Sequence, residues 1–475
     1  TAGFNSFIPL SFQPQNNEMG IESYTLGVDD LRTIAVARIF LDNFMHIKTY
    51  WIMTGQDVAQ LALNFGANDL DGTVSDEKIS RMAGGRSGKG MVARNLINLI
   101  CKARHIPYER NTLYECLSQV DVSSLPVFHS DHPLEENLVQ RALACKELAA
   151  DELIELAQKA NFFDLSRFAL EHIAKSKDRK HVRSFAFEVN LATNCLHNKE
   201  LFFADLEKQL LFLKEKSQYP KEAVLFSLDL SESAFAGSER INLESLYNLL
   251  TEISKLYPGI KLAIRGIQAY WEMAQEAEVS LDIALDKLKN LGVQSWESSP
   301  GEHESKLTNT EVYNLHKKAH QHDLVTLAKV ELNSPPGMSL PLWNNFFDKL
   351  LSLRKLQNET KGLVAVSVEP AEGSSVSANE YMRAVALARI ALPSVFNIIS
   401  PLKRMPCMLE KKATCSKNKG LNGQEKIASV ALLMGANDLG SFPIGEQVGV
   451  EISTLIRAAG FEATLRNERF NYYPL

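Results

Sequence analysis

The sequence lacks the features that would place it in a membrane or on a polyanion. No apolar run approaches the roughly 18 residues that a membrane helix needs. The chain does not open with a basic region followed by an apolar stretch, so we expect no signal peptide. A net charge of −6 and a pI near 6.1 give no reason to expect nucleic acid or an anionic membrane as a partner.

Cysteine is also scarce, and its spacing excludes the common cysteine sites. None of the six cysteines falls in a CxxC or CxxxCxxC pattern, so no zinc or iron–sulfur site can be read from them. Scattered thiols in a long chain are typical of a reducing compartment, and we expect a cytoplasmic protein.

The length of 475 residues and the 45% hydrophobic content predict a globular protein of two to four domains. The chain opens at Thr1 without an initiator methionine, which suggests that it is a fragment.

Four sequence blocks occur twice, in the same order. Gly-Ala-Asn-Asp-Leu stands at 66–70 and again at 435–439. The other pairs of blocks are 1–14 with 360–370, 31–39 with 382–390, and 100–111 with 456–467. Chance does not repeat four blocks in one order, so the chain contains a duplicated structural unit.

The second unit shows eight short runs rich in β-forming residues, separated by segments with helical spacing. They lie at 184–192, 223–230, 260–267, 293–298, 324–332, 363–370, 395–402 and 436–442. Most are continuous apolar runs, as expected of parallel strands covered on both faces. The pattern predicts an α/β protein with a (β/α)₈ TIM-type barrel, with a doubly wound sheet as the alternative.

The first unit corresponds only to the last three β/α units of such a barrel. Three strands cannot close a barrel. We therefore expect residues 1–115 to be the C-terminal portion of a first barrel whose body lies upstream, 116–140 to be a linker, and 141–475 to form the second, complete barrel.

In barrels of this kind, binding groups lie where strands end. In the first unit these positions carry polar side chains suited to a small-molecule ligand, namely Gln13, Asn16, Asn68, Asp69, Asp71 and Thr73. The structural alternative is that Gly66 ends a helix in the left-handed conformation while Asn68 and Asp69 shape the turn. Arg32 and Arg38 recur as Arg383 and Arg389, and we expect salt bridges that orient their helices.

Residues 1–115 closely resemble the C-terminal part of aminodeoxyfutalosine synthase. The resemblance is carried by "TAGFNSFIPLSFQPQN", "DDLRTIAVARIFLDNFMHIKTYWIMTG", "GANDLDGTV" and "YERNTLYE". That family consists of radical S-adenosylmethionine enzymes of the futalosine route to menaquinone. The related deazaflavin (FO) synthase branch shares much of the pattern.

Residues 140–475 resemble, more faintly, dehypoxanthine futalosine cyclase, through "GANDLGS", "LRKLQNETKG" and "IAKSKDRKHVRSFAFEVNLATNC". The family's CxxxCxxC motif, which holds three irons of a 4Fe–4S cluster, is missing. The expected cysteine positions hold Leu196, Glu200 and Phe203, and Cys195 lies one residue too early. The second barrel is therefore predicted to be a pseudoenzyme.

The resemblance implies that an upstream barrel half, with its 4Fe–4S cluster and S-adenosylmethionine, would add a 5′-deoxyadenosyl radical to an enol-ether benzoate. The six polar residues would then bind substrate, with no catalytic residue assigned, and this chain alone is expected to bind no cofactor and to be inactive. A second hypothesis makes the second barrel a scaffold or a metabolite-binding module. A third gives it a cluster-free chemistry at residues near its strand ends, namely Asp229, Arg265, Glu297, Lys329 and Glu369.

Overall fold

A computed structural model gives the structure of the protein. It describes residues 3–14, 18–21, 23, 25–74, 78–82, 90–120, 134–175, 181–191, 199–215, 223–230, 241–298, 307–335, 341–406, 423–443 and 451–474. Among these residues, no helix has the length and apolar character needed to cross a membrane.

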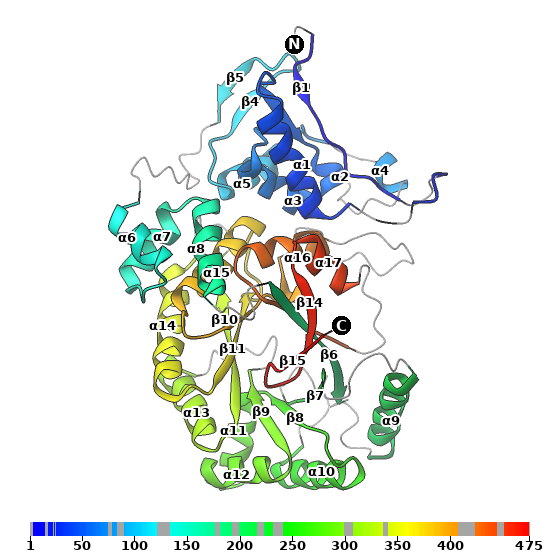
Figure 1. Cartoon of the computed structure of the whole chain (residues 1–475), viewed down its shortest axis with the longest axis vertical. Coiled ribbons are helices and arrows are strands. Elements are labelled where there is room, and N and C mark those ends of the chain that lie inside the picture. Colours follow the sequence, from blue (N-terminus) through cyan, green and yellow to red (C-terminus); the bar gives the residue numbers. More distant parts are fainter. Residues whose placement is uncertain are drawn as a thin grey trace.

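Residues 181–474 form a closed barrel of eight parallel strands (Figure 1). The strands are β6 (Val182–Leu191), β7 (Val224–Asp229), β8 (Leu262–Arg265), β9 (Val293–Glu297), β10 (Val325–Leu332), β11 (Leu363–Pro370), β12 (Asn397–Ile399) and β13 (Asp438–Pro443). Strand β13 returns to pair with β6, with Asp438 opposite Ser184. The predicted barrel is confirmed, and the doubly wound alternative is wrong.

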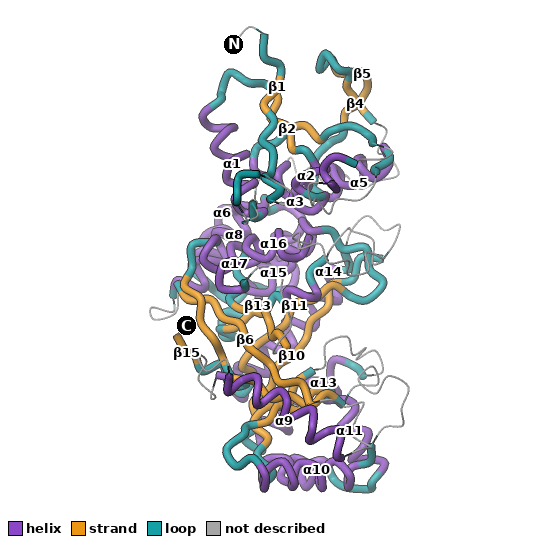
Figure 2. Tube along the Cα trace, turned by 90° about the vertical axis from the view of Figure 1, so that its right-hand side faces the viewer, coloured by secondary structure: helices purple, strands orange, loops and turns teal. Residues whose placement is uncertain are grey.

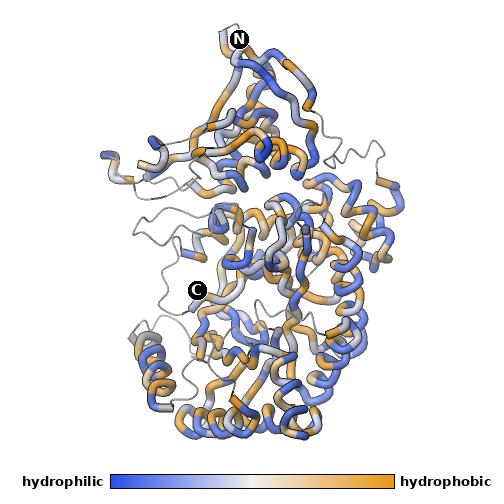
Figure 3. Tube along the Cα trace, turned by 180° about the vertical axis from the view of Figure 1, so that it is seen from behind, coloured by the Kyte–Doolittle hydropathy of each residue, from blue (hydrophilic) through white to orange (hydrophobic). Residues whose placement is uncertain are grey.

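Helices surround the strands and place their apolar stripes against them. Figure 3 shows polar and apolar residues alternating along these helices. The helices are α9 (Lys199–Glu215), α10 (Leu243–Leu256), α11 (Ile267–Glu276), α12 (Leu281–Asn290), α13 (Asn309–Gln321), α14 (Trp343–Thr360), α15 (Ala378–Ala391), α16 (Gly423–Leu433) and α17 (Ile452–Ala458). In α10 the leucines at 243, 246, 249 and 250 are all buried, as the helical spacing predicts.

The first unit contains a three-stranded parallel sheet with helices on it. The strands are β1 (Ser6–Phe7), β2 (His46–Thr49) and β3 (Asp69–Leu70), and β2 lies in the middle. The helices are α1 (Gly27–Phe40), α2 (Trp51–Thr54), α3 (Gln56–Ala62), α4 (Ile79–Met82) and α5 (Ala93–Lys102).

A hairpin ends each unit. In the first unit β4 (Tyr108–Arg110) pairs with β5 (Cys116–Gln119), and in the second β14 (Glu462–Arg466) pairs with β15 (Tyr472–Pro474). In the second unit β14 also adds to barrel strand β6. The duplication thus extends a few residues beyond the repeated sequence blocks.

Three helices lead into the second barrel: α6 (Glu136–Leu143), α7 (Ala150–Lys159) and α8 (Phe162–Ala174). In α7, Leu153, Leu156 and Ala157 are buried on one face, as its spacing predicts. The range 116–140, predicted as a linker, holds β5 and the first turn of α6. Residues 121–133 within that range lie outside the described part of the chain.

The first unit lies against helices of the second barrel rather than against its strands. Figures 1 and 2 show α1, α3 and α5 beside α15, α16 and α17. Helix α1 packs on α16, while α3 packs on both α15 and α16.

Candidate functional site

The Gly-Ala-Asn-Asp-Leu segment of the first unit forms a turn held by Arg38. Gly66 has φ 106°, and the Arg38 Nε atom donates to its carbonyl oxygen at 2.8 Å. Asn68 Oδ1 accepts from Arg38 Nη2 and from the backbone N–H of Ile47, both at 2.9 Å. Asn68 is therefore committed to the turn, as the structural alternative predicted.

The second copy of the segment repeats these bonds. Gly435 has φ 101°, and Arg389 Nε donates to its carbonyl oxygen at 2.9 Å. Asn437 Oδ1 accepts from Arg389 Nη2 at 2.9 Å and from the N–H of Ile398 at 2.8 Å. The repeated sequence thus encodes a scaffold that both units share.

The four repeated arginines act mainly through neutral oxygens, so the expectation of orienting salt bridges is wrong for three of them. Arg383 Nη2 donates to the carbonyls of Ala157 and Ala160, at 3.0 and 2.8 Å. Arg38 and Arg389 have the partners given above. Within the described part of the chain, Arg32 is the one of the four that faces a carboxylate, that of Asp29 at 3.8 Å on the exposed surface.

A cluster of charged side chains lies at the ends of β2 and β3 in the first unit. Arg110 forms a two-pronged ion pair with Asp69, with Nη2 at 2.8 Å from Oδ1. Lys48 Nζ lies 3.1 Å from Asp71 Oδ1 and 3.9 Å from Asp69 Oδ1. Tyr114 covers the cluster, with the Arg110 guanidinium 4.1 Å from its ring centre. We call Lys48, Asp69, Asp71, Arg110 and Tyr114 the mouth cluster.

Both cations of the mouth cluster are held in their charged form. Burial alone would lower the pKa of Lys48, but the hydrogen bond and the charge of Asp71, with the charge of Asp69, raise it. The hydrogen bond to Asp69 raises the pKa of Arg110. Asp71 keeps 28% of its side chain exposed, against 7% for Asp69, so Asp71 is the carboxylate that a ligand can reach.

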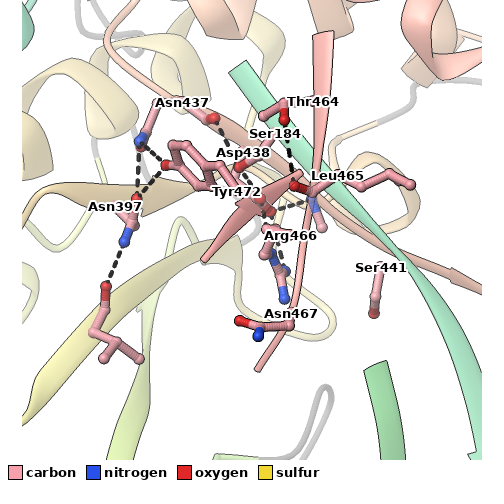
Figure 4. A network of polar contacts seen from close by, with 12 residues as sticks. Ser184, Asn397, Asn437, Asp438, Ser441, Thr464, Leu465, Arg466, Asn467 and Tyr472 are labelled. Carbon is pink, nitrogen blue, oxygen red and sulfur yellow. Dashed lines mark hydrogen bonds and ion pairs between the residues drawn. The ribbon is translucent and has the colours of Figure 1, made fainter. Parts of the chain in front are cut away.

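The second unit keeps only the inner part of this arrangement (Figure 4). Asp438 and Arg466 repeat the ion pair of Asp69 and Arg110, with Arg466 Nε at 2.9 Å from Asp438 Oδ2. Phe470 takes the place of Tyr114. The register of the repeat puts Ile399 and Gly440 where the first unit has Lys48 and Asp71. The outer Lys48–Asp71 pair is therefore specific to the first unit.

The structure brings only some of the predicted site residues together. Asp69 and Asp71 meet through Lys48. Gln13 is occupied elsewhere, because its side-chain Nε2 donates to the carbonyl of Met53 at 3.3 Å. Thr73 is exposed in the segment after β3, and Asn16 lies outside the described residues.

Three members of the mouth cluster were not predicted from the sequence, namely Lys48, Arg110 and Tyr114. One signal was present for Arg110, because the matched blocks 100–111 and 456–467 both end in Arg-Asn. The contact that Arg110 makes with Asp69 spans 41 residues of sequence, so the pairing itself could not be read from the blocks.

The interior of the second barrel contains a second buried charge network. Arg265 on β8 pairs with Glu188 on β6 and lies 3.3 Å from Glu297 on β9. The hydroxyls of Ser227 and Ser441 also donate to Glu188. Burial would raise the pKa of Glu188, but the charge of Arg265 and these hydrogen bonds lower it. The network holds Glu188 as a carboxylate and neutralises it.

The five residues named for a cluster-free chemistry fall into a group of three and a pair. Arg265 and Glu297 contact each other directly, and the charge of Asp229 helps to raise the pKa of Arg265. Burial raises the pKa of Glu369, which lies 3.9 Å from Arg404, and the charge of Lys329 opposes that rise. Lys329 itself lies 3.2 Å from Glu331. Within the described residues these groups neutralise one another.

The residues at the expected cluster positions do not fit a 4Fe–4S cluster. Glu200 is exposed on α9, and Phe203 on the same helix packs against the apolar core beside Phe202. Leu196 and Cys195 lie outside the described residues. A cluster of this type needs a set of thiolates, which these side chains do not supply. Across the described part of the chain, no three His, Cys, Asp or Glu side chains are grouped to hold a metal ion.

A family model matches the first unit, and several curated enzymes match part of the chain. Residues 1–122 match the family model described as the CofH/MqnC C-terminal region. Aminodeoxyfutalosine synthase from Thermus thermophilus is 48% identical over 118 residues, which is 24% of this chain and 32% of that protein.

Two further relatives match part of the chain at lower identity. The 5-amino-6-(D-ribitylamino)uracil–L-tyrosine 4-hydroxyphenyl transferase of Methanococcus vannielii is 41% identical over 123 residues, 25% of this chain and 34% of that protein. The cyclic dehypoxanthine futalosine synthase of Streptomyces coelicolor is 37% identical over 142 residues, 29% of this chain and 33% of that protein. The chain thus spans about a third of the length of these curated relatives.

Two solved structures match the chain at low identity. Methylornithine synthase PylB has a TM-score of 0.41 and 13% identity, with 65% of this chain and 87% of that one covered. The hydrogenase maturase HydG of Carboxydothermus hydrogenoformans has a TM-score of 0.43 and 14% identity, with 70% and 81% covered.

Proposed function

We propose that the first unit supplies the C-terminal part of the active site of a radical S-adenosylmethionine enzyme of the futalosine route. The reaction would be that of aminodeoxyfutalosine synthase, in which a 5′-deoxyadenosyl radical adds to an enol-ether benzoate. The 48% identity to the Thermus enzyme carries this proposal. The deazaflavin branch is the second candidate, because the transferase of Methanococcus vannielii matches the chain at 41%.

The exposed apolar face of α1 supports a further barrel half as the partner of the first unit. Val36, Ile39 and Phe40 on α1 are 62%, 81% and 82% exposed. Their repeat equivalents on α15, namely Leu387, Ile390 and Ala391, are fully buried beneath the rest of the second barrel. A shallow apolar groove follows the exposed face of α1 beside Phe7 of β1. Further strand–helix units, on this polypeptide or on another, would cover it.

We propose that the mouth cluster is the part of the first unit that binds substrate. We assign contact with a polar small molecule to the Lys48–Asp71 pair and to the exposed Thr73. Gln13, which would have to release its bond to Met53, and Asn16 are further proposed binding residues. Asn68 and Asp69 would act indirectly, by holding the turn and Arg110. The 4Fe–4S cluster and S-adenosylmethionine would be bound by the missing half, in the cytoplasm, where scattered thiols stay reduced.

For the second barrel we propose a scaffold role without radical chemistry. Its acids and bases are buried against one another, and it lacks the outer Lys–Asp pair of the first unit. Its helices α15 and α16 instead support α1 and α3.

Chimeras test the reaction and distinguish the two branches. The matched third of the Thermus synthase, or of the Methanococcus transferase, would be replaced by residues 1–120 of this chain. We expect aminodeoxyfutalosine from the Thermus chimera and no coupled product from the other, since the mouth cluster must fit its own substrate. If only the Methanococcus chimera forms its product, the first unit belongs to an enzyme of the deazaflavin branch and the proposed reaction is wrong.

A reconstitution experiment tests the scaffold role. The chain from Thr1 to Leu475 would be treated anaerobically with iron and sulfide, beside the intact Thermus synthase as a positive control. We expect the absorption of a 4Fe–4S cluster in the control alone. A cluster in this chain would contradict the proposal for the second barrel.

A further inference from the structure

The contact between the two units has the pattern of a two-fold dimer. In the register of the repeat, α1 is equivalent to α15 and α3 to α16. Helix α1 packs on α16, α3 packs on α15, and the equivalent helices α3 and α16 pack on each other between them. Such reciprocity, in which element i meets j while j meets i, defines an isologous interface.

Hydrogen bonds across the contact repeat this reciprocity. From α1, Arg32 Nη2 donates to the carbonyl of Ala458 at 2.9 Å. From α15, Asn379 Nδ2 donates to the carbonyl of Lys102 at 2.9 Å. Lys102 and Ala458 are equivalent residues, each the last of its helix, in α5 and α17. The same helix end is thus capped from the opposite unit on both sides.

The contact is close at Gly27, the first residue of α1. A Cβ atom there would lie 2.3 Å from the carbonyl oxygen of Lys426 and 2.9 Å from Val58. Only glycine fits at this distance. The backbones of α1 and α16 therefore approach each other closely at Gly27, and the two units are packed together as well as linked by the chain.

The charges at the contact break the symmetry. Asp30 on α1 and Lys426 on α16 are 7% and 9% exposed, and their charges attract each other. Lys426 Nζ also donates to the carbonyls of Met53 and Thr54, at 2.9 and 3.0 Å, and Ser11 donates to Asp30 at 2.8 Å. The repeat equivalents are Tyr381 for Asp30 and Asp57 for Lys426.

We infer that the two units form a two-fold interface carried within one chain, and that Lys426 makes this interface selective. The α1–α3 face fits the α15–α16 face, where Asp30 meets Lys426. It does not fit a second copy of itself, because self-pairing would bury Asp30 of one chain beside Asp57 of the other. Two like charges brought together in a buried contact oppose such a dimer strongly. The second barrel thereby takes the place of a second subunit, whatever reaction the first unit serves.

Exchanging the two charges tests this inference in the full chain. In the double variant Lys426→Asp with Asp57→Lys, Asp30 lies near a carboxylate at position 426 of its own chain. In a dimer, Asp30 would instead lie near the ammonium group at position 57 of the second copy. We expect this double variant to have twice the mass of the wild type in light scattering. Adding Val58→Glu, which places a charge in the same face, should return the mass to that of the wild type.

Two controls separate selectivity by charge from a general weakening of the contact between the units. The neutral pair Lys426→Met with Asp57→Asn should keep the wild-type mass. The reversed pair Asp30→Lys with Lys426→Asp should also keep it, and should unfold at a higher temperature than Lys426→Asp alone. A folded double variant with the wild-type mass would overturn the inference. If the double variant does not fold, the comparison of Asp30→Lys with Lys426→Asp against Lys426→Asp alone decides. Equal unfolding temperatures for these two proteins would overturn the inference.

Discussion

At the scale of single residues, Arg389 shows how the repeated segment is stabilised. Its fully buried guanidinium donates to the carbonyls of Gly435, Val395 and Phe396 and to Asn437. Burial lowers the pKa of Arg389 to about 9. These oxygens satisfy the hydrogen-bond donors of Arg389 but carry no negative charge. The free-energy cost of burying the positive charge must therefore be offset by other interactions in the fold.

The glycine of this segment gives a test at one position. Gly66→Ala should lower the free energy of unfolding by about 2 kcal/mol or more, because φ is 106° and the new Cβ would lie 2.7 Å from Arg38 Cβ. Gly72→Ala is the matched control, since nothing lies within 4 Å of a Cβ there and its φ is not in the left-handed region. Urea denaturation of both variants measures the difference. Equal effects would contradict this account of the turn.

Residue types alone indicated where the candidate site lies but not which side chains form it. Asp69 and Asp71 follow an apolar strand, and strand ends carry the binding groups of a barrel. Lys48 and Arg110 could not be selected in the same way, because each becomes part of the mouth cluster only when distant segments fold together. Gln13 looked equivalent to them in sequence, yet the path of the chain turns it toward Met53.

At the scale of elements, α1 and α15 show how context changes one sequence pattern. Every residue of α15 is buried, because the helix lies between the barrel strands and the first unit. Helix α1 has nearly the same core motif, but its outer face is exposed. The similarity of the two segments predicted two equivalent helices, while their different burial depends on neighbours that the pattern does not contain.

The barrel strands were readable because parallel strands are covered on both faces and so appear as continuous apolar runs. The hairpins were not. Strand β14 has the sequence Glu-Ala-Thr-Leu-Arg, which carries no continuous apolar run. Its buried Arg466 is compensated by an ion pair with Asp438, which the sequence pattern does not reveal. Strand β5, at Cys116–Gln119, is exposed along its length and carries no apolar pattern.

The charge network inside the second barrel leads to a prediction about its strands. Arg265→Met should destabilise the protein by about 3–5 kcal/mol, because Glu188 and Glu297 would remain buried without their cation. Lys289→Met, which removes a surface pair with Asp323, should have a much smaller effect, because solvent screens an exposed pair. Thermal and urea unfolding of the two variants provide the comparison. A small effect at Arg265 would show that the network does not hold the strands together.

At the scale of the whole molecule, the contact between the units should respond to pH through Asp30. Burial raises the pKa of Asp30 to about 6, while the charge of Lys426 and the Ser11 hydrogen bond oppose the rise and the neighbouring Asp29 adds to it. An unfolded aspartate has a pKa near 3.9, so the folded state binds the extra proton between about pH 4 and pH 6. The contribution of this group is present below about pH 4 and is lost as the pH rises through 6.

Asp30→Asn should remove this contribution while leaving an amide oxygen for Ser11. Measured between pH 4 and 7, its free energy of unfolding should decline less with rising pH than that of the wild type. Parallel curves for the two proteins would show that Asp30 does not titrate in this range.

The covalent link between the paired helical faces has a consequence for dilute protein. Partners on separate chains come apart as their concentration falls below the dissociation constant, whereas a tether keeps the local concentration near the millimolar range at any dilution. The α1–α3 face therefore remains covered at a few copies per cell, and its assembly requires no encounter between molecules.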